Sequence, residues 1–136
     1  TALGHGVGPF YKSSDEAKAL TWLRAFLVRE EGEVLWIASG APRAWFAPGC
    51  TFGLRGAATF FGPLSYRIEA ERQAVAAWID APTRTPPAEL RLRLRRPDRA
   101  AVRAVVVEGA ASWELMDEET VRLIAPRGLL RVHAAY

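Results

Sequence analysis

The sequence predicts a mainly β fold, in which an antiparallel β-sandwich follows one N-terminal α-helix at about residues 14–30. Three observations support this prediction. Short segments that are apolar, or that alternate between apolar and polar residues, recur along most of the chain with turn residues between them. One segment near the N-terminus instead has apolar residues at helical spacing. The chain has 136 residues and is 50% hydrophobic, which is enough for the core of one domain.

The expected helix lies in the segment SSDEAKALTWLRAFLVREEG. Ser13 and Glu16 have the spacing of a capping box, and Gly32 is a natural helix end because glycine adopts a left-handed conformation at little cost. A strand over 22–28 stays open as an alternative, because apolar residues also alternate there, but the capping signals favour the helix. The apolar stripe of the helix consists of Ala17, Ala19, Leu20, Trp22, Leu23, Phe26 and Leu27.

The rest of the chain has the pattern of β-strands in eight segments, namely 33–39, 64–70, 74–80, 89–95, 102–109, 111–116, 120–126 and 129–136. The clearest is ELRLRLR, where leucines should be buried and arginines exposed. By the same alternation, Trp113 should face the core. Glu108-Gly109 and Arg127-Gly128 are expected hairpin turns. The alternating residues of ELRLRLR are Leu90, Leu92 and Leu94, and Arg91, Arg93 and Arg95.

Charge and residue usage argue against several classes of function. The net charge is only +3, and 16 arginines occur with two lysines and no asparagine, as is typical of GC-rich bacterial genomes. The arginines of 89–96 alternate with core leucines, not with the exposed aromatics of a nucleic-acid groove, so no nucleic-acid partner is expected. A solvated face, or one docked on an acidic neighbour, is expected instead. No apolar run reaches the roughly 20 residues of a membrane span, so no membrane partner is expected, and cytoplasmic and exported locations stay open.

No pattern in the chain predicts a catalytic residue, a metal site or a cofactor. Cys50 is the only cysteine, so it cannot form an internal disulfide, and we expect it to be a small buried residue. His5 and His133 are far apart and lack patterned carboxylates, which argues against a metal site. Adjacent carboxylates are interpreted as solvated charge and not as a glycosidic acid–base pair, namely Glu30 with Glu31 and Glu118 with Glu119.

The segment APRAWFAPG, residues 41–49, allows two interpretations. Aromatic rings can stack on sugars, so Trp45 and Trp78, with Arg43 beside the first, are candidate carbohydrate contacts. Alternatively, Pro42 starts a single helical turn, and Trp45 and the phenylalanine after it fill the end of the sandwich. The second interpretation is favoured because apolar runs flank the segment on both sides.

The stretch LVREEGEVLWIASGAPRAWFAPG resembles the junction in bacterial six-hairpin glycosidase-like proteins where the last helix of an α/α toroid joins a C-terminal β-domain. The resemblance continues through AATFFGPLSYRIE, APTRTPPAELRLRLRRP and VRAVVVEGAASWE, and it covers residues 20–136. It implies that residues 1–32 are the loop and helix that end a preceding helical domain, and that residues 33–136 form the sandwich domain. One departure is Glu108-Gly109, which stands where an Asn-Gly type of turn is expected.

In such enzymes the catalytic carboxylates lie in the toroid, so the resemblance implies no catalytic residue in this chain. The implied function is that of a non-catalytic C-terminal accessory β-domain of a glycoside hydrolase-like enzyme acting on carbohydrate. Its implied partner is the preceding α/α-toroid domain of the same polypeptide. The alternative is an independent carbohydrate-binding module that uses Trp45 and Trp78. Because the first residue is Thr1 and not methionine, we expect a fragment, a processed form or a trimmed form of a longer protein.

Overall fold

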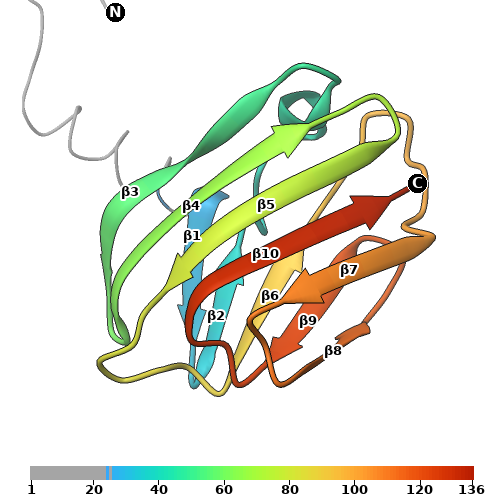
Figure 1. The fold of residues 1–136 in the computed structure, drawn as a ribbon. Coiled ribbons are helices and arrows are strands. Elements are labelled where there is room, and N and C mark those ends of the chain that lie inside the picture. The colour runs from blue at the N-terminus through green and yellow to red at the C-terminus, as the bar shows by residue number, and fades with distance from the viewer. Residues whose placement is uncertain (1–23, 25) are drawn as a thin grey trace, which may run out of the picture.

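Residues 24 and 26–136 are described in the computed structural model of the chain, and they form two β-sheets of five strands each. The two sheets lie face to face, and side chains from both enclose one apolar core (Figure 1). The prediction of a mainly β fold built as a sandwich is therefore confirmed.

The first sheet has the strand order β1-β2-β6-β9-β8, and the second has the order β3-β4-β5-β10-β7. The strands of the first sheet are β1 (Val28–Glu31), β2 (Val34–Ile37), β6 (Glu89–Arg93), β8 (Ser112–Leu115) and β9 (Thr120–Ile124). The strands of the second sheet are β3 (Thr51–Thr59), β4 (Gly62–Ala70), β5 (Ala74–Ala81), β7 (Ala104–Glu108) and β10 (Gly128–Ala135). A short 3-10 helix, η2 (Arg43–Phe46), lies between β2 and β3 at one end of the sandwich (Figure 1).

All eight predicted strand segments contain an observed strand, but β1 and β3 are not predicted. β3 includes two glycines, which are depleted in strands, and its register on β4 shifts between Leu54 and Ala57. That bulge interrupts the alternation of apolar and polar residues. The strand is therefore ordered by its pairing with β4 and not by a visible sequence pattern.

The start of the first sheet corrects the predicted helix. Most of the helix expected over 14–30 lies outside the described residues. Leu27 is still helical, but Val28–Glu31 forms an antiparallel pair with β2 around Gly32, which has a φ of +60°. The last turn of the predicted helix is therefore wrong, because pairing with β2 overrides the local helical pattern. The pairing of β1 with β2 also crosses the domain boundary expected at residue 32.

The connections between strands differ from the prediction. β7 and β8 flank Glu108-Gly109 but belong to different sheets, and so do β9 and β10 on either side of Arg127-Gly128. Both turns therefore lead from one sheet to the other and are not hairpins. The fold is also not wholly antiparallel, because β2 and β6 pair in parallel.

The burial of side chains confirms one half of the alternation in β6 and corrects the other. Leu90, Leu92 and Leu94 are fully buried, as predicted. The arginines between them are half-buried and not exposed, because neighbouring side chains and the loop after β2 cover them. Trp113 does not face the core: it is 40% exposed, and all four residues of the edge strand β8 are exposed.

Candidate functional site

The APRAWFAPG segment forms the turn η2 at one end of the sandwich. Pro42, with a φ of −59°, precedes the 3-10 helix, and Phe46 at its end is fully buried. Trp45 is half-buried and meets Phe52 edge to face, with ring centroids 5.4 Å apart. Phe46 meets the same ring at 5.2 Å. These contacts favour the interpretation of the segment as a plug, since both aromatic rings pack on the core.

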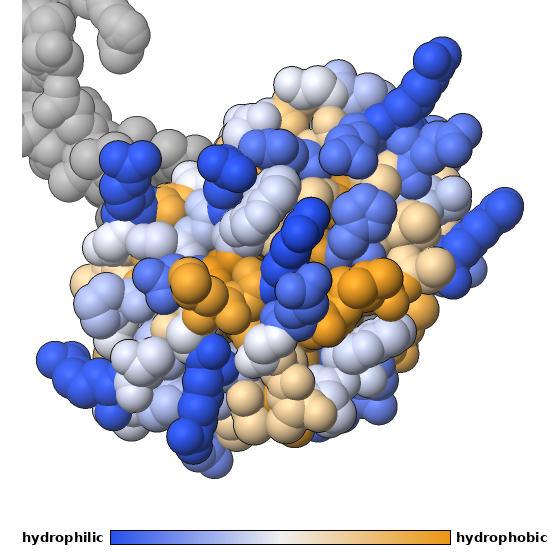
Figure 2. Space-filling model, viewed as in Figure 1, coloured by the Kyte–Doolittle hydropathy of each residue, from blue (hydrophilic) through white to orange (hydrophobic). Residues whose placement is uncertain are grey.

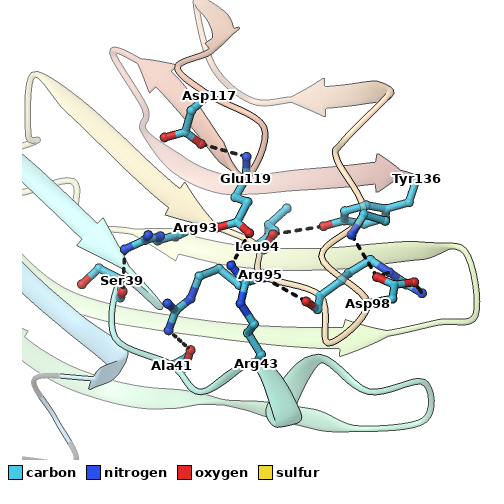
Figure 3. A network of polar contacts seen from close by, with 12 residues as sticks. Ser39, Ala41, Arg43, Arg93, Leu94, Arg95, Asp98, Asp117, Glu119 and Tyr136 are labelled. Atoms are coloured by element: carbon cyan, nitrogen blue, oxygen red, sulfur yellow. Dashed lines mark hydrogen bonds and ion pairs between the residues drawn. The ribbon is translucent and has the colours of Figure 1, made fainter.

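Arg43 is engaged in holding this turn in place. Its guanidinium donates one hydrogen bond to the main-chain carbonyl of Arg96 at 2.9 Å and another to Oε1 of Glu119 at 2.5 Å (Figure 3). The Arg43 side chain is 24% exposed and that of Glu119 is 19% exposed. Arg43 therefore ties η2 to the loops after β6 and before β9.

Trp78 lies in a different place, on the outer face of the second sheet. An open hollow of about 790 Å³ spans this face, and its floor crosses all five strands. The volume is within the range of about 300–1,000 Å³ that is usual for small-ligand sites. In Figure 2, which shows this face, hydrophobic patches in the middle are separated by charged side chains.

The ring of Trp78 is flanked by two arginines. In the strand register, Arg67 on β4 and Arg131 on β10 are both direct cross-strand partners of Trp78. The guanidinium carbon of Arg67 lies 4.5 Å from the ring centroid, and that of Arg131 lies 5.8 Å from it. Asp80 and Glu108 add carboxylates to the lining of the hollow. The site therefore combines an indole with charges of both signs.

The first sheet repeats this arrangement on its own outer face. Trp36 on β2 is the direct partner of Arg29 on β1 and of Arg91 on β6. Their guanidinium carbons lie 5.0 and 5.1 Å from its ring centroid. Sequence reasoning did not single out Trp36, because the pattern exists only in the pairing of strands. Its recurrence on both faces indicates that the arginines stabilise half-buried indoles, at about 0.5–1 kcal/mol for each contact.

The three candidate carbohydrate contacts are not brought together. Arg43 and Trp45 lie on η2, and neither lines the hollow around Trp78. A sugar that stacked on Trp78 would have to displace Arg67, which also pairs with Glu69 at 3.0 Å. Trp78 is therefore the one candidate that faces a hollow, and its ring is already in contact with arginine.

An arginine-rich region surrounds the end of β6, where the sequence predicts a solvated face or one docked on an acidic neighbour. Arg96 is only 6% exposed, donates to the carbonyls of Glu71 and Arg72 at 3.1 and 2.8 Å, and pairs with Asp98. The ring of Tyr136 lies 4.9 Å from its guanidinium carbon. Arg96 is therefore a buried residue that links the end of β6 to the turn between β4 and β5.

Two more arginines of this region contact the loop after β2 (Figure 3). Arg93 donates to the carbonyl of Ser39 at 3.3 Å, and Arg95 donates to that of Ala41 at 2.6 Å. The Nε atom of Arg95 is buried and has no hydrogen-bond partner among the described residues. Burial lowers the pKa of Arg95, and the neighbouring charges of Arg93 and Arg43 lower it further. The charge of Glu119 acts in the opposite direction and raises it.

The expected solvated carboxylates are in part structural. Glu30 accepts from Arg24 at 3.1 Å and from the backbone N–H of Phe60 at 2.8 Å, and its side chain is 12% exposed. Glu119 is bound by Arg43, whereas Glu31 and Glu118 are exposed. Neither pair therefore consists only of solvated carboxylates. In each pair, one carboxylate is exposed and the other binds groups from distant parts of the chain.

The described residues contain no cluster of three or more metal-ligating side chains. Cys50 is half-buried. His133 lies on the outer face of β10, and its Nε2 is 3.8 Å from Oε1 of Glu71, which follows β4. Within the same part of the chain, no helix has the length and apolar character needed to span a membrane. His5 lies outside the described residues.

No family model, no curated protein and no solved structure matches this chain. The resemblance to six-hairpin glycosidase-like proteins stays a prediction from the sequence. The function is therefore argued from the contacts and exposed surfaces of the domain itself.

Proposed function

We propose that the chain is a non-catalytic accessory β-domain of a glycoside hydrolase-like enzyme acting on carbohydrate. Its partner is the preceding α/α-toroid domain, as in the C-terminal region of six-hairpin glycosidase-like proteins. The observation that carries the proposal is the use of Arg43 and Trp45 inside the domain. Arg43 binds Glu119 and a main-chain carbonyl, and Trp45 packs on Phe52, so the predicted sugar contacts of η2 serve the fold.

Exposed apolar side chains support the presence of a neighbouring domain. Phe60, in the turn between β3 and β4, is 84% exposed, and its backbone N–H is held by Glu30 of β1. Glu30 also binds Arg24, close to the point where the described part of the chain begins. Large exposed apolar residues often mark surfaces that pack on a partner. The turn that carries Phe60 therefore fits a contact with the domain that precedes β1.

One observation favours the alternative, an independent carbohydrate-binding module. The hollow around Trp78 is large enough for a small oligosaccharide, and its lining offers hydroxyl, carboxylate and guanidinium groups. Binding there would require the guanidinium of Arg67 to leave the ring of Trp78, or the sugar to contact only the edge of the indole. Trp45 would take no part, because it does not line the hollow.

Two measurements on the isolated chain test the proposal. Assays with aryl glycosides and oligosaccharides should show no turnover, because the catalytic carboxylates of such an enzyme are expected in the toroid and not in this domain. Titration with the same oligosaccharides should show no saturable binding. Saturable binding that is lost in Trp78→Ala but kept in Trp36→Ala would support the binding module instead. Trp36 is the matched control, since it has the same pair of flanking arginines on the opposite sheet.

The sequence encoded upstream in the same gene tests the enzyme setting. An accessory domain of this kind should follow a run of amphipathic helices that carry buried carboxylates. A start codon directly before residue 1, or an unrelated upstream domain, would contradict the proposed partner.

A further inference from the structure

Three arginines lie at the loop between β2 and η2, and two of them donate hydrogen bonds to its carbonyls. Arg93 and Arg95 reach it from β6 and the residues after β6, and Arg43 lies at its far end on η2 (Figure 3). We call Arg43, Arg93 and Arg95 the arginine cluster. None of its residues lines the hollow around Trp78, which belongs to the second sheet.

The arginine cluster has fewer carboxylates than positive charges. Arg43 is bound to Glu119, whereas Arg93 and Arg95 donate only to main-chain carbonyls in the described part of the chain. Other arginines of the same sheet differ in this respect. Arg91 and Arg122, for example, share the carboxylate of Glu89 at 2.7 and 2.8 Å. Arg93 and Arg95 therefore form no ion pair in the described part of the chain, and Glu119, whose charge acts on Arg95, is already bound by Arg43.

The partly buried position of Arg93 and Arg95 makes the lack of a carboxylate partner energetically unfavourable. Each of Arg93 and Arg95 uses one terminal nitrogen for a loop carbonyl, and the Nε of Arg95 is buried without an acceptor among the described residues. Like charges that are held close together in a partly desolvated place repel more strongly than in bulk water. An anion between the two side chains would accept from terminal N–H groups that have no acceptor in the described part of the chain, and it would offset this repulsion.

We propose that the arginine cluster is a binding site for one oxyanion, the carboxylate of an acidic sugar or a free phosphate, held between Arg93 and Arg95. A guanidinium presents a planar fork of N–H donors that matches two oxygens of either group. Arg43 adds positive charge at the side of the site, and its pairing with Glu119 fixes its position. The site goes beyond the proposed accessory function: it shares Arg43 with the argument for that function, but the anion is held by Arg93 and Arg95 and requires no neighbouring domain.

The wild-type chain, labelled with ¹⁵N, provides the first test. Inorganic phosphate and galacturonate are titrated separately, with sodium chloride at the same ionic strength and neutral galactose as controls. We expect saturable shifts of the Nε–Hε resonances of Arg93 and Arg95 and no comparable shift at Arg127, which is exposed and distant in sequence. Saturation by both anions supports the site, and saturation by one alone supports it and identifies the source. Equal shifts with sodium chloride, or at all arginines alike, would overturn it.

Thermal melts of variants provide the second test. At about ten times its Kd, the bound anion should raise the Tm of the wild type by about 3 °C or more. This rise should disappear in Arg93→Gln and Arg95→Gln and persist in Arg127→Gln. If Arg95→Gln does not fold, Arg93→Gln still decides, because Arg93 makes one long hydrogen bond to a carbonyl. An equal rise in Arg93→Gln and the wild type would overturn the proposal.

Discussion

The side chain of Arg43 binds that of Glu119 across 76 positions of the chain, with Nη2 and Oε1 2.5 Å apart. The pair links the turn between the two sheets to the loop that precedes β9. Because both side chains are largely shielded, the interaction is screened less than a surface ion pair. The contact is therefore a candidate for a measurable share of the stability of the sandwich.

A double-mutant cycle of Arg43→Ala and Glu119→Ala should reveal coupling between these residues. We expect each single variant to lose about 1–3 kcal/mol, because the remaining partner keeps an unsatisfied charge. The double variant should lose less than the sum, with a coupling of about 0.5–3 kcal/mol. Urea denaturation gives the free energies of unfolding. Additive losses would mean that the pair contributes nothing beyond its separate side chains.

The two faces of β6 should differ strongly in their sensitivity to truncation. Leu92→Ala should cost about 2–5 kcal/mol, because Leu92 is fully buried between the sheets. Arg93→Ala should remain within roughly 0.5 kcal/mol of the wild type, since its side chain is half-buried and makes one long hydrogen bond. Chemical denaturation of both variants checks this. Similar losses at the two positions would contradict the assignment of the faces.

The turn η2 should be more sensitive at Phe46 than at Trp45. Phe46→Ala should destabilise the fold by about 3–5 kcal/mol, because the ring is fully buried. Trp45→Ala should cost about 1–3 kcal/mol, since its ring is half-buried and keeps an edge contact with Phe52. Thermal melts are measured beside a glycan titration of each variant. An unchanged Tm for Trp45→Ala together with lost glycan binding would make Trp45 a sugar contact and not a plug.

The positions of most strands could be predicted from the sequence because burial imposes a local pattern. Leu90, Leu92 and Leu94 alternate with arginines, and all three are buried. The single turn after Pro42 was also predictable, since proline fixes its own φ and favours the start of a helical turn. These features depend on neighbours within a few residues, which is the range that a sequence pattern reports.

The pairing of strands was not predictable in the same way. Gly109 has a φ of +96°, and a Cβ there would lie 2.4 Å from the carbonyl oxygen of Leu129. Glycine is thus needed at this position, where the chain passes from one sheet to the other. A glycine in a hairpin turn looks the same in the sequence, so the sequence does not distinguish the two kinds of connection. The two flanked tryptophans, Trp36 and Trp78, likewise arise from strands distant in sequence. Trp113 alternates as a core residue would, yet β8 is an edge strand and leaves it exposed.

The stability of the protein should fall at alkaline pH because of Tyr66. Its hydroxyl donates to the carbonyl of Leu27 at 2.6 Å, and burial raises its pKa far above the ordinary value of 10.0. The folded state therefore holds the phenolic proton more tightly than the unfolded state. The resulting stability is fully present below about pH 10 and is lost as the pH rises toward the folded pKa. For one such group the slope is at most about 1.4 kcal/mol per pH unit.

Tyr66→Phe should separate this effect from the hydrogen bond. At neutral pH the variant should lose about 0.5–1.5 kcal/mol, because the carbonyl of Leu27 loses its donor. Above about pH 10 its stability should decline less steeply than that of the wild type. Tyr136→Phe is the control. Burial also raises the pKa of Tyr136, although the charge of the nearby Arg96 lowers it. Removing the hydroxyl of Tyr136 should therefore reduce the alkaline loss of stability by a separate amount. Urea denaturation at a series of pH values gives the free energies, and parallel declines for Tyr66→Phe and the wild type would show that the proton on Tyr66 does not stabilise the fold.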